Sequence, residues 1–104
     1  MDSITGQLDI IRKKIAEYAK PALTGEVSYL TQSTDRKLYT VTDVSSVDGK
    51  HQADISLAVR LAGAYIVIEH DMNNKPLVDA LVQVGIPRSQ IILAYAGEPV
   101  PESV

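Results

Sequence analysis

Apolar residues in the first part of the chain recur with the period of an α-helix. From residue 4 onward they follow one another in alternating steps of four and three, which places them on a single stripe of a helix: Ile4, Leu8, Ile11, Ile15, Tyr18 and Ala22. Pro21 lacks an amide hydrogen and disfavours helical conformation at Lys20. The pattern therefore predicts a helix over residues 3–20 whose apolar stripe packs against the rest of the protein.

Segments in the middle of the chain alternate between apolar and polar residues, as strands with one buried face do. These segments are residues 26–34, 37–44, 52–62 and 65–71. The pairs that separate them are typical of turns: Asp35-Arg36, Asp48-Gly49 and Gly63-Ala64. We therefore expect an antiparallel meander in which each strand lies beside the next.

The third segment has the clearest alternation, and its apolar residues are predicted to face the core: Ile55, Leu57, Val59 and Leu61. Gly63-Ala64 fits a type II′ turn, which takes Gly at its first central position. That turn places Leu61 opposite Ile66, Val59 opposite Ile68, and Leu57 opposite His70. A slip of one residue would turn every apolar side chain outward, so this register is well specified.

A second helix is predicted over residues 75–84, with Asn74 as its N-cap. Its apolar residues leave only a narrow polar stripe, so it should lie against the sheet: Leu77, Val78, Ala80, Leu81, Val82 and Val84. Gly85 suits the left-handed conformation that ends a helix, and Pro87 prevents continuation. A short strand over residues 91–95 and an extended tail follow.

These elements predict an α+β fold: an N-terminal helix, a four-stranded antiparallel β-meander, a second helix packed on the sheet, and a short final strand. We expect one domain over residues 1–104. It comprises a helix in residues 1–20, the meander in 26–71, helix plus strand in 75–95, and the tail in 96–104. Both helices are expected on one face of the sheet.

Composition narrows the range of functions. The chain is 45% hydrophobic without Phe or Trp, and the absence of Cys excludes disulfides and thiolate metal sites. Its formal charge of −3 is atypical of a protein that grips duplex DNA directly, because such proteins replace phosphate counterions with basic residues. Any role on nucleic acid is therefore expected to run through a partner. No secretory signal or membrane-spanning run is visible, so we expect a cytoplasmic protein.

Candidate chemistry is sparse. Glu69, His70 and Asp71 stand at the end of a strand before a loop, where binding residues often lie. His70 is expected to share a face with Ile66 and Ile68, which favours a half-buried strand-end histidine over a catalytic one. A small-molecule enzyme that uses these residues is the less favoured alternative. We expect no catalytic group, metal or cofactor, because a metal needs several converging ligands and the other histidine, His51, is predicted near the opposite end of the sheet.

Basic residues cluster at Arg12-Lys13-Lys14 on the first predicted helix. A solvated helix face is the favoured interpretation, and a phosphate-contacting patch is the alternative.

The later part of the chain resembles the XisI family. The family pattern L-V-x-x-G-V-P-K-x-D-I-V-L-x-F is matched outright at Leu81, Val82, Gly85, Pro87, Ile91 and Leu93, and conservatively at Ile86, Arg88, Ile92 and Tyr95. The strand Ile66–Asp71 is similar to the family's I-W-I-Q-x-D, with Val67 in place of Trp. Ala58 and Arg60 stand where the family tends to carry His and Asp.

The resemblance implies a XisI-like fold and a non-enzymatic accessory protein. Family members are thought to act with a nuclease-like partner, XisH, and a site-specific recombinase to control DNA excision during heterocyst differentiation in cyanobacteria. The partner would bind the far side of the sheet or the loop after Asp71, and the expected partner-binding residues are Glu69, His70, Asp71, Arg60, Arg88 and Tyr95. The alternative is a self-associating binding domain, a homo-oligomer, with no recombination role.

Overall fold

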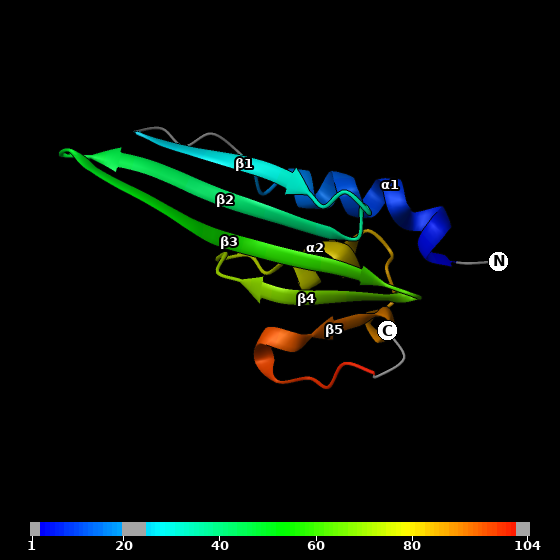
Figure 1. Cartoon of the computed structure of the whole chain (residues 1–104). Coiled ribbons are helices and arrows are strands. Elements are labelled where there is room, and N and C mark those ends of the chain that lie inside the picture. Colours follow the sequence, from blue (N-terminus) through cyan, green and yellow to red (C-terminus); the bar gives the residue numbers. More distant parts are fainter. Residues whose placement is uncertain (1–2, 20–24, 102–104) are drawn as a thin grey trace.

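A five-stranded sheet forms the centre of the protein (Figure 1). The structure, a computed structural model, describes residues 3–19 and 25–101. The strands are β1 Glu26–Gln32, β2 Leu38–Val47, β3 Lys50–Ala62, β4 Tyr65–Asp71 and β5 Ile91–Leu93, in the spatial order β1-β2-β3-β4-β5. The helices are α1 Ser3–Ala16 and α2 Leu77–Gln83, with short 3-10 turns η1 Arg88–Gln90 and η2 Ala94–Ala96.

The predicted α+β architecture is confirmed, with one addition to the sheet. The first four strands form the expected antiparallel meander. The final strand β5 pairs with β4 in the parallel sense, so α2 is the crossover between two parallel strands. β5 ends at Leu93 rather than at Tyr95, because the chain turns into η2 at Ala94.

Both helices cover the same face of the sheet, which we call the inner face (Figure 1). Ile11 and Ile15 of α1 are fully buried, as their positions on the apolar stripe predicted. They pack in one cluster with α2 and the sheet, which includes Tyr39, Val41, Leu57, Val59, Leu61, Ile66, Ile68, Leu77, Leu81, Ile86 and Ile91. Ile4 has no described side chain, and Ala22 lies outside the described residues.

The helix α1 ends at Ala16, earlier than the predicted Lys20. The amide of Tyr18 donates to the carbonyl of Ile15 (3.0 Å), and the amide of Ala19 donates to that of Ala16 (3.1 Å). These i to i−3 bonds tighten the chain into a 3-10 turn, which satisfies the carbonyl groups of Ile15 and Ala16 at the end of the helix.

The two tight turns have the predicted chemistry. Asp48 and Gly49 both have positive φ angles, 53° and 78°, as a type I′ turn requires. Gly63 has a φ of 59°, as the first central position of a type II′ turn requires. Strands β2 and β3 reach further toward the Asp48-Gly49 turn than predicted, whereas β1 ends at Gln32 instead of residue 34.

The predicted register between β3 and β4 holds near the turn and fails at its far end. Leu61 lies opposite Ile66 and Val59 lies opposite Ile68, as expected. A β-bulge between Ala58 and Val59 then shifts the pairing, so that His70 faces Ala58 and Leu57 faces Asp71. The expectation that His70 lies opposite Leu57 and shares a face with Ile66 and Ile68 is therefore wrong, because the bulge inserts Glu69 and reverses the alternation.

The β2–β3 hairpin extends beyond the two helices (Figure 1). A second irregularity, between Val41 and Thr42, shifts the alternation of the hairpin there. Ile55 pairs with Thr42 and is 46% exposed, so its predicted place in the core is wrong. Leu57, Val59 and Leu61 are buried as expected because they lie under the helices.

The helix α2 is shorter than predicted and begins differently. Asn74 is not its N-cap: the cap position is Pro76, and no side chain of that residue caps the helix. Val82 and Val84 are 43% and 37% exposed, so only one side of α2 packs on the sheet. Gly85 ends the helix with a φ of 100°, as predicted. The amide of Ile86 donates to Leu81 and that of Gly85 to Val82, which is the Schellman pattern.

The opposite face of the sheet, the outer face, is covered only in part. Val67 and Ile92 alternate with inner-face residues along β4 and β5, and they form a second small cluster with Ala62. Tyr65, Ala94 and Val100 pack against it. The segment after β5 therefore covers the outer face over β4 and β5, whereas the outer face of β1, β2 and the far end of β3 carries exposed apolar residues.

Candidate functional site

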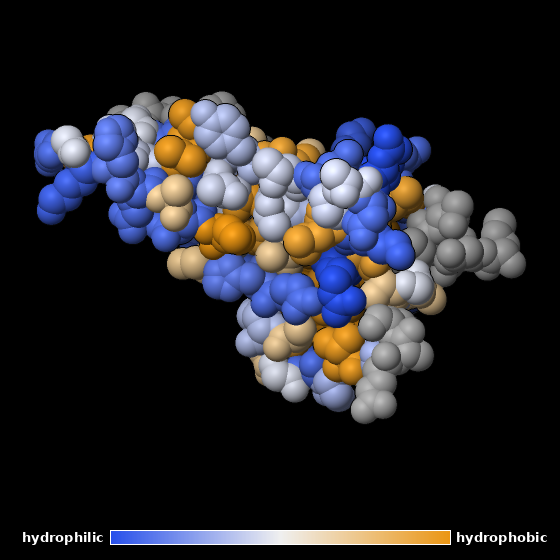
Figure 2. Space-filling view, viewed as in Figure 1, coloured by the Kyte–Doolittle hydropathy of each residue, from blue (hydrophilic) through white to orange (hydrophobic). Residues whose placement is uncertain are grey.

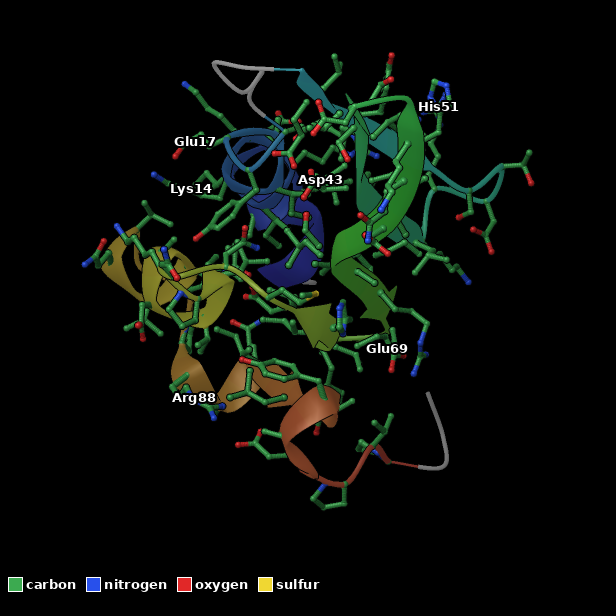
Figure 3. The ribbon with its side chains drawn as sticks, turned by 90° about the vertical axis from the view of Figure 1, so that its left-hand side faces the viewer. Lys14, Glu17, Asp43, His51, Glu69 and Arg88 are labelled. Carbon is green, nitrogen blue, oxygen red and sulfur yellow. The ribbon has the colours of Figure 1, made fainter. Side chains whose placement is uncertain are left out.

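Three of the expected partner-binding residues, Arg60, Glu69 and His70, lie together on the outer face. Arg60 pairs with Val67 across the β3–β4 ladder, and His70 pairs with Ala58. Glu69 is the extra residue of the bulge, and its Oε2 accepts a hydrogen bond from Nε of Arg60 at 2.8 Å. Figure 3 shows Glu69 on the side of the sheet away from Lys14, Glu17 and Arg88. We call these three residues the outer polar cluster.

The outer polar cluster is accessible and is not needed to fill the core. The side chains of Arg60 and Glu69 are 33% and 38% exposed. A hollow of about 470 Å³ lies beside Arg60, lined by Ser33, Asp35, Lys37, Leu38 and the Gly63 turn. Such a cluster offers a cation, a carboxylate and an imidazole to a partner at one place.

Asp71, the next residue, points to the inner face and has a structural role. Its Oδ1 accepts hydrogen bonds from the amide of Asn73 (2.9 Å) and from Nδ2 of Asn73 (2.8 Å). Its Oδ2 accepts the amide of Leu77 at 2.7 Å, which satisfies one of the free amides at the start of α2. Asp71 thus caps α2 from outside the helix, a role that the sequence pattern predicted for Asn74.

Arg88 and Tyr95 lie near the C-terminal segment, apart from the outer polar cluster. Nη1 of Arg88 donates to the carbonyl of Ile91 (2.7 Å), and Nη2 donates to Oε2 of Glu98 (2.7 Å). Oε1 of Glu98 accepts the amide of Leu93 at 2.8 Å. That amide, followed by the Arg88 guanidinium, holds the pKa of Glu98 below its usual value. Arg88 therefore fastens the segment after β5 to the strand.

Tyr95 is 41% exposed. Partial burial, followed by the negative charges of Asp71 and Asp79, raises the pKa of its hydroxyl. The six predicted residues thus divide into an outer polar cluster, an internal cap at Asp71, and a pair near the C-terminal segment.

A further surface was not identified from the sequence. Val27 lies opposite Val44, and Tyr29 lies opposite Thr42, which itself faces Ile55. These pairings gather Val27, Tyr29, Val44 and Ile55 on the outer face, where they are 45%, 53%, 36% and 46% exposed. We call them the outer apolar patch, and Figure 2 shows apolar residues gathered on this side of the strands. The alternation of Val27 and Tyr29 was the signal, but only the strand pairing brings the four together.

The basic residues of α1 do not form one phosphate-binding face. Nε of Arg12 donates to the hydroxyl of the buried Tyr39 at 2.7 Å, and the guanidinium lies 5.8 Å from the centre of its ring. Lys14 pairs with Glu17 at 3.4 Å on the surface. The interpretation as a solvated helix face fits Lys14, whereas Arg12 anchors the helix to β2.

Among residues 3–19 and 25–101, no group of three or more His, Cys, Asp or Glu side chains is placed to hold a metal ion. His51 lies in the β2–β3 hairpin beside the Asp48-Gly49 turn, opposite Ser46 and far along the sheet from His70. None of the described helices is long and apolar enough to cross a membrane.

The chain is similar to known proteins both in its sequence pattern and in its fold. The sequence pattern of the family described as XisI protein matches residues 1–102. No curated protein matches the chain at a significant level.

Several solved structures share the fold, and two of them come from one organism. One is a XisI-like protein from Anabaena variabilis ATCC 29413, with 17% identity and a TM-score of 0.75 over 86% of this chain and 84% of the other. The other is described as the fdxN element excision controlling factor XisI from the same organism, with 25% identity and a TM-score of 0.60 over 85% of this chain and 78% of the other.

Proposed function

This chain belongs to the XisI family, and on that basis we propose that it is a non-enzymatic accessory protein that controls the site-specific excision of a DNA element. The observation that carries the proposal is the match of the family pattern over residues 1–102. It is supported by a structural neighbour, 25% identical, that is described as an excision controlling factor.

The proposed action is indirect. We expect the protein to work in the cytoplasm with a XisH-type nuclease-like protein and a site-specific recombinase, in a cyanobacterial cell that differentiates heterocysts. A net charge of −3 opposes tight binding to duplex DNA, because no excess of Lys and Arg is present to release phosphate counterions. Contacts to DNA are therefore expected to come from the partners.

The outer polar cluster is the proposed contact for the XisH-type partner. Of the six expected residues, Asp71 and Arg88 use their side-chain polar atoms in hydrogen bonds within the chain. Arg60 and Glu69 bond to each other on an exposed surface, so a partner can replace or extend that pair without disturbing the core. The hollow beside Arg60 can receive a side chain of the partner. This favours the outer face over the loop after Asp71.

The test is binding between purified proteins. The chain is co-expressed with a XisH-type protein encoded beside it, and the complex is isolated by size exclusion; its affinity is then measured by calorimetry. Replacing both members of the outer pair, Arg60→Ala with Glu69→Ala, is expected to weaken binding by about tenfold or more, as at interface residues whose truncation costs over 1 kcal/mol.

A matched control lies on the other side of the molecule (Figure 3). Lys14 and Glu17 form a similar exposed ion pair on the helix side. The double variant Lys14→Ala with Glu17→Ala should bind as the wild type does, and neither double variant should lose much stability because exposed ion pairs contribute little. Absence of any complex would refute the proposed partner, and equal weakening by both variants would refute the proposed surface.

A further inference from the structure

Within the described residues, the edge strand β1 lacks three features that commonly prevent an edge from pairing with another chain. Within the described chain, β1 stands at one end of the strand order and pairs on one side only, with β2. Natural edge strands are commonly protected by Lys, by Pro or by a bulge. The sequence of β1, E-V-S-Y-L-T-Q, has no Lys or Pro, and its register with β2 is continuous.

The open edge presents a regular row of backbone groups. The amide of Ser33 donates to Leu38, and the amide of Ser46 donates to Gly25. In an antiparallel pair, successive residues alternate between bonding to the partner strand and facing the other way. The odd-numbered residues therefore bond to β2, and the remaining ones direct their N–H and C=O groups to the open side: Glu26, Ser28, Leu30 and Gln32.

We propose that two copies of this chain form a dimer in which β1 pairs antiparallel with β1 of the second copy around a two-fold axis at Tyr29. The two five-stranded sheets then become one continuous sheet. Two-fold pairing of identical surfaces is the commonest form of protein oligomer, and strand addition at a sheet edge is a recurring mode of recognition. The proposal is independent of the excision role.

The side chains of β1 suit this register. With Tyr29 on the axis, all seven residues of the strand are paired. Tyr29 faces Tyr29 of the second copy, Val27 faces Thr31, Ser28 faces Leu30, and Glu26 faces Gln32. The only charged residue of the strand therefore meets a neutral amide that can donate to it, and no like charges face each other. A shift by two residues leaves Glu26 or Gln32 without a partner.

The backbone bonds and the apolar area act together in this arrangement. Residues that face each other across a hydrogen-bonded position exchange two bonds, so the four outward-directed residues give about eight intermolecular bonds. The Tyr29 rings of the two copies meet at the two-fold axis on the outer face. An aromatic cross-strand pair stabilises a sheet by more than the burial of its apolar area alone. Val27 and Tyr29 lie at the edge of the outer apolar patch that is nearest to the second copy. The outer apolar patches of the two copies therefore join into one apolar surface.

The oligomeric state tests the edge. The wild-type chain should elute and scatter light as a dimer at tens of micromolar. Ser28→Pro removes an amide that points to the open side while leaving the bonds to β2 in place, and it should give monomers. Ser28 also donates its hydroxyl to Asp43 at 2.6 Å. Ser28→Ala loses that hydroxyl bond but keeps the amide, so it is the matched control and should remain dimeric.

The register is tested by cross-linking, which does not depend on a destabilising substitution. The chain has no Cys, so a single introduced thiol reports only on its own position. In Tyr29→Cys the two thiols face each other across a non-hydrogen-bonded pair, at a distance suited to a disulfide. Oxidised glutathione should convert most of this variant to a covalent dimer. In Val27→Cys the thiols lie about four residues apart, roughly 13 Å, and should not cross-link.

Three outcomes overturn the proposal. One is a wild-type chain that is monomeric at all accessible concentrations. Another is a dimer that persists unchanged in Ser28→Pro together with no cross-linking of Tyr29→Cys. The third is a dimer that Ile55→Lys abolishes while Ser28→Pro does not, since this would show that the outer faces stack upon each other instead.

Discussion

Removing the carboxylate of Asp71 should destabilise the protein through the start of α2. In Asp71→Ala, three hydrogen bonds are lost, from the amide and side chain of Asn73 and from the amide of Leu77. Asp71 is only half-buried, so we take each bond at about 1 kcal/mol or slightly less, the net value of an ordinary hydrogen bond rather than the higher value of a bond to a charged group. The sum, about 2–3 kcal/mol, includes the loss of a helix cap, which alone costs about 0.5–2 kcal/mol. Against a typical total of about 5–15 kcal/mol, this is a large change.

The measurement is urea or thermal unfolding followed by circular dichroism. For a domain of this size, a loss of about 2–3 kcal/mol lowers the melting temperature by roughly 10–20 °C. The control is Asp79→Ala, which removes an exposed carboxylate in the first turn of the same helix. That carboxylate interacts mainly with the helix dipole, for which the loss is about 0.3–1 kcal/mol. If Asp71→Ala costs no more than Asp79→Ala, the carboxylate does not hold the helix, and the reasoning is refuted.

Two further predictions concern the backbone and the C-terminal segment. Gly85 has a φ of 100°, and a Cβ added there would meet nothing within 4 Å, so Gly85→Ala should cost about 1–2 kcal/mol of stability from backbone strain alone. Gly6 lies inside α1 and has equal space for a Cβ, so Gly6→Ala should instead stabilise the protein by about 0.5–1 kcal/mol. Melting temperatures of the two variants that move in the same direction would contradict this reasoning. The pKa of Glu98 is lower in the folded state, so its bonds to Leu93 and Arg88 are fully present above pH 4.5 and are lost as the pH falls through that lower value. The amide resonance of Leu93 should therefore titrate with a midpoint below 4.5 and should not do so in Glu98→Gln.

Local patterns predicted the elements well because the responsible forces are local. Ile11 and Ile15 follow from helical periodicity, and Asp48-Gly49 and Gly85 follow from the few residues that tolerate positive φ. The order of strands β1 to β4 follows from short turns, which force neighbouring strands to pair antiparallel. The errors at element ends, such as α1 ending at Ala16, arise because terminal hydrogen bonds depend on the local geometry of the last turn.

Less of the candidate site than of the fold could be predicted from the sequence. One bulge places two consecutive residues, Glu69 and His70, on the outer face. The next residue, Asp71, lies on the inner face. Period-two alternation cannot show where a bulge falls, since the bulge depends on how both strands pair. The cap on α2 was missed for a related reason: the acceptor is Asp71, six residues before Leu77, and only the path of the loop brings them together.

The sequence by itself determined which segments are helices and strands, where the Asp48-Gly49 and Gly63-Ala64 turns and the glycine end of α2 fall, and that the core is mainly aliphatic, because each depends on spacing or on the conformational freedom of single residues. The family pattern in residues 81–95 belongs to the same category, since it records the packing of α2, its glycine end and β5. Only the tertiary structure decided which face each polar residue occupies, that β5 runs parallel to β4, and that β2 and β3 extend beyond the helices. It also decided that β1 is the end strand of the sheet formed by the described residues and lies beside exposed apolar residues. These properties arise from pairing between distant segments, and no single segment contains them.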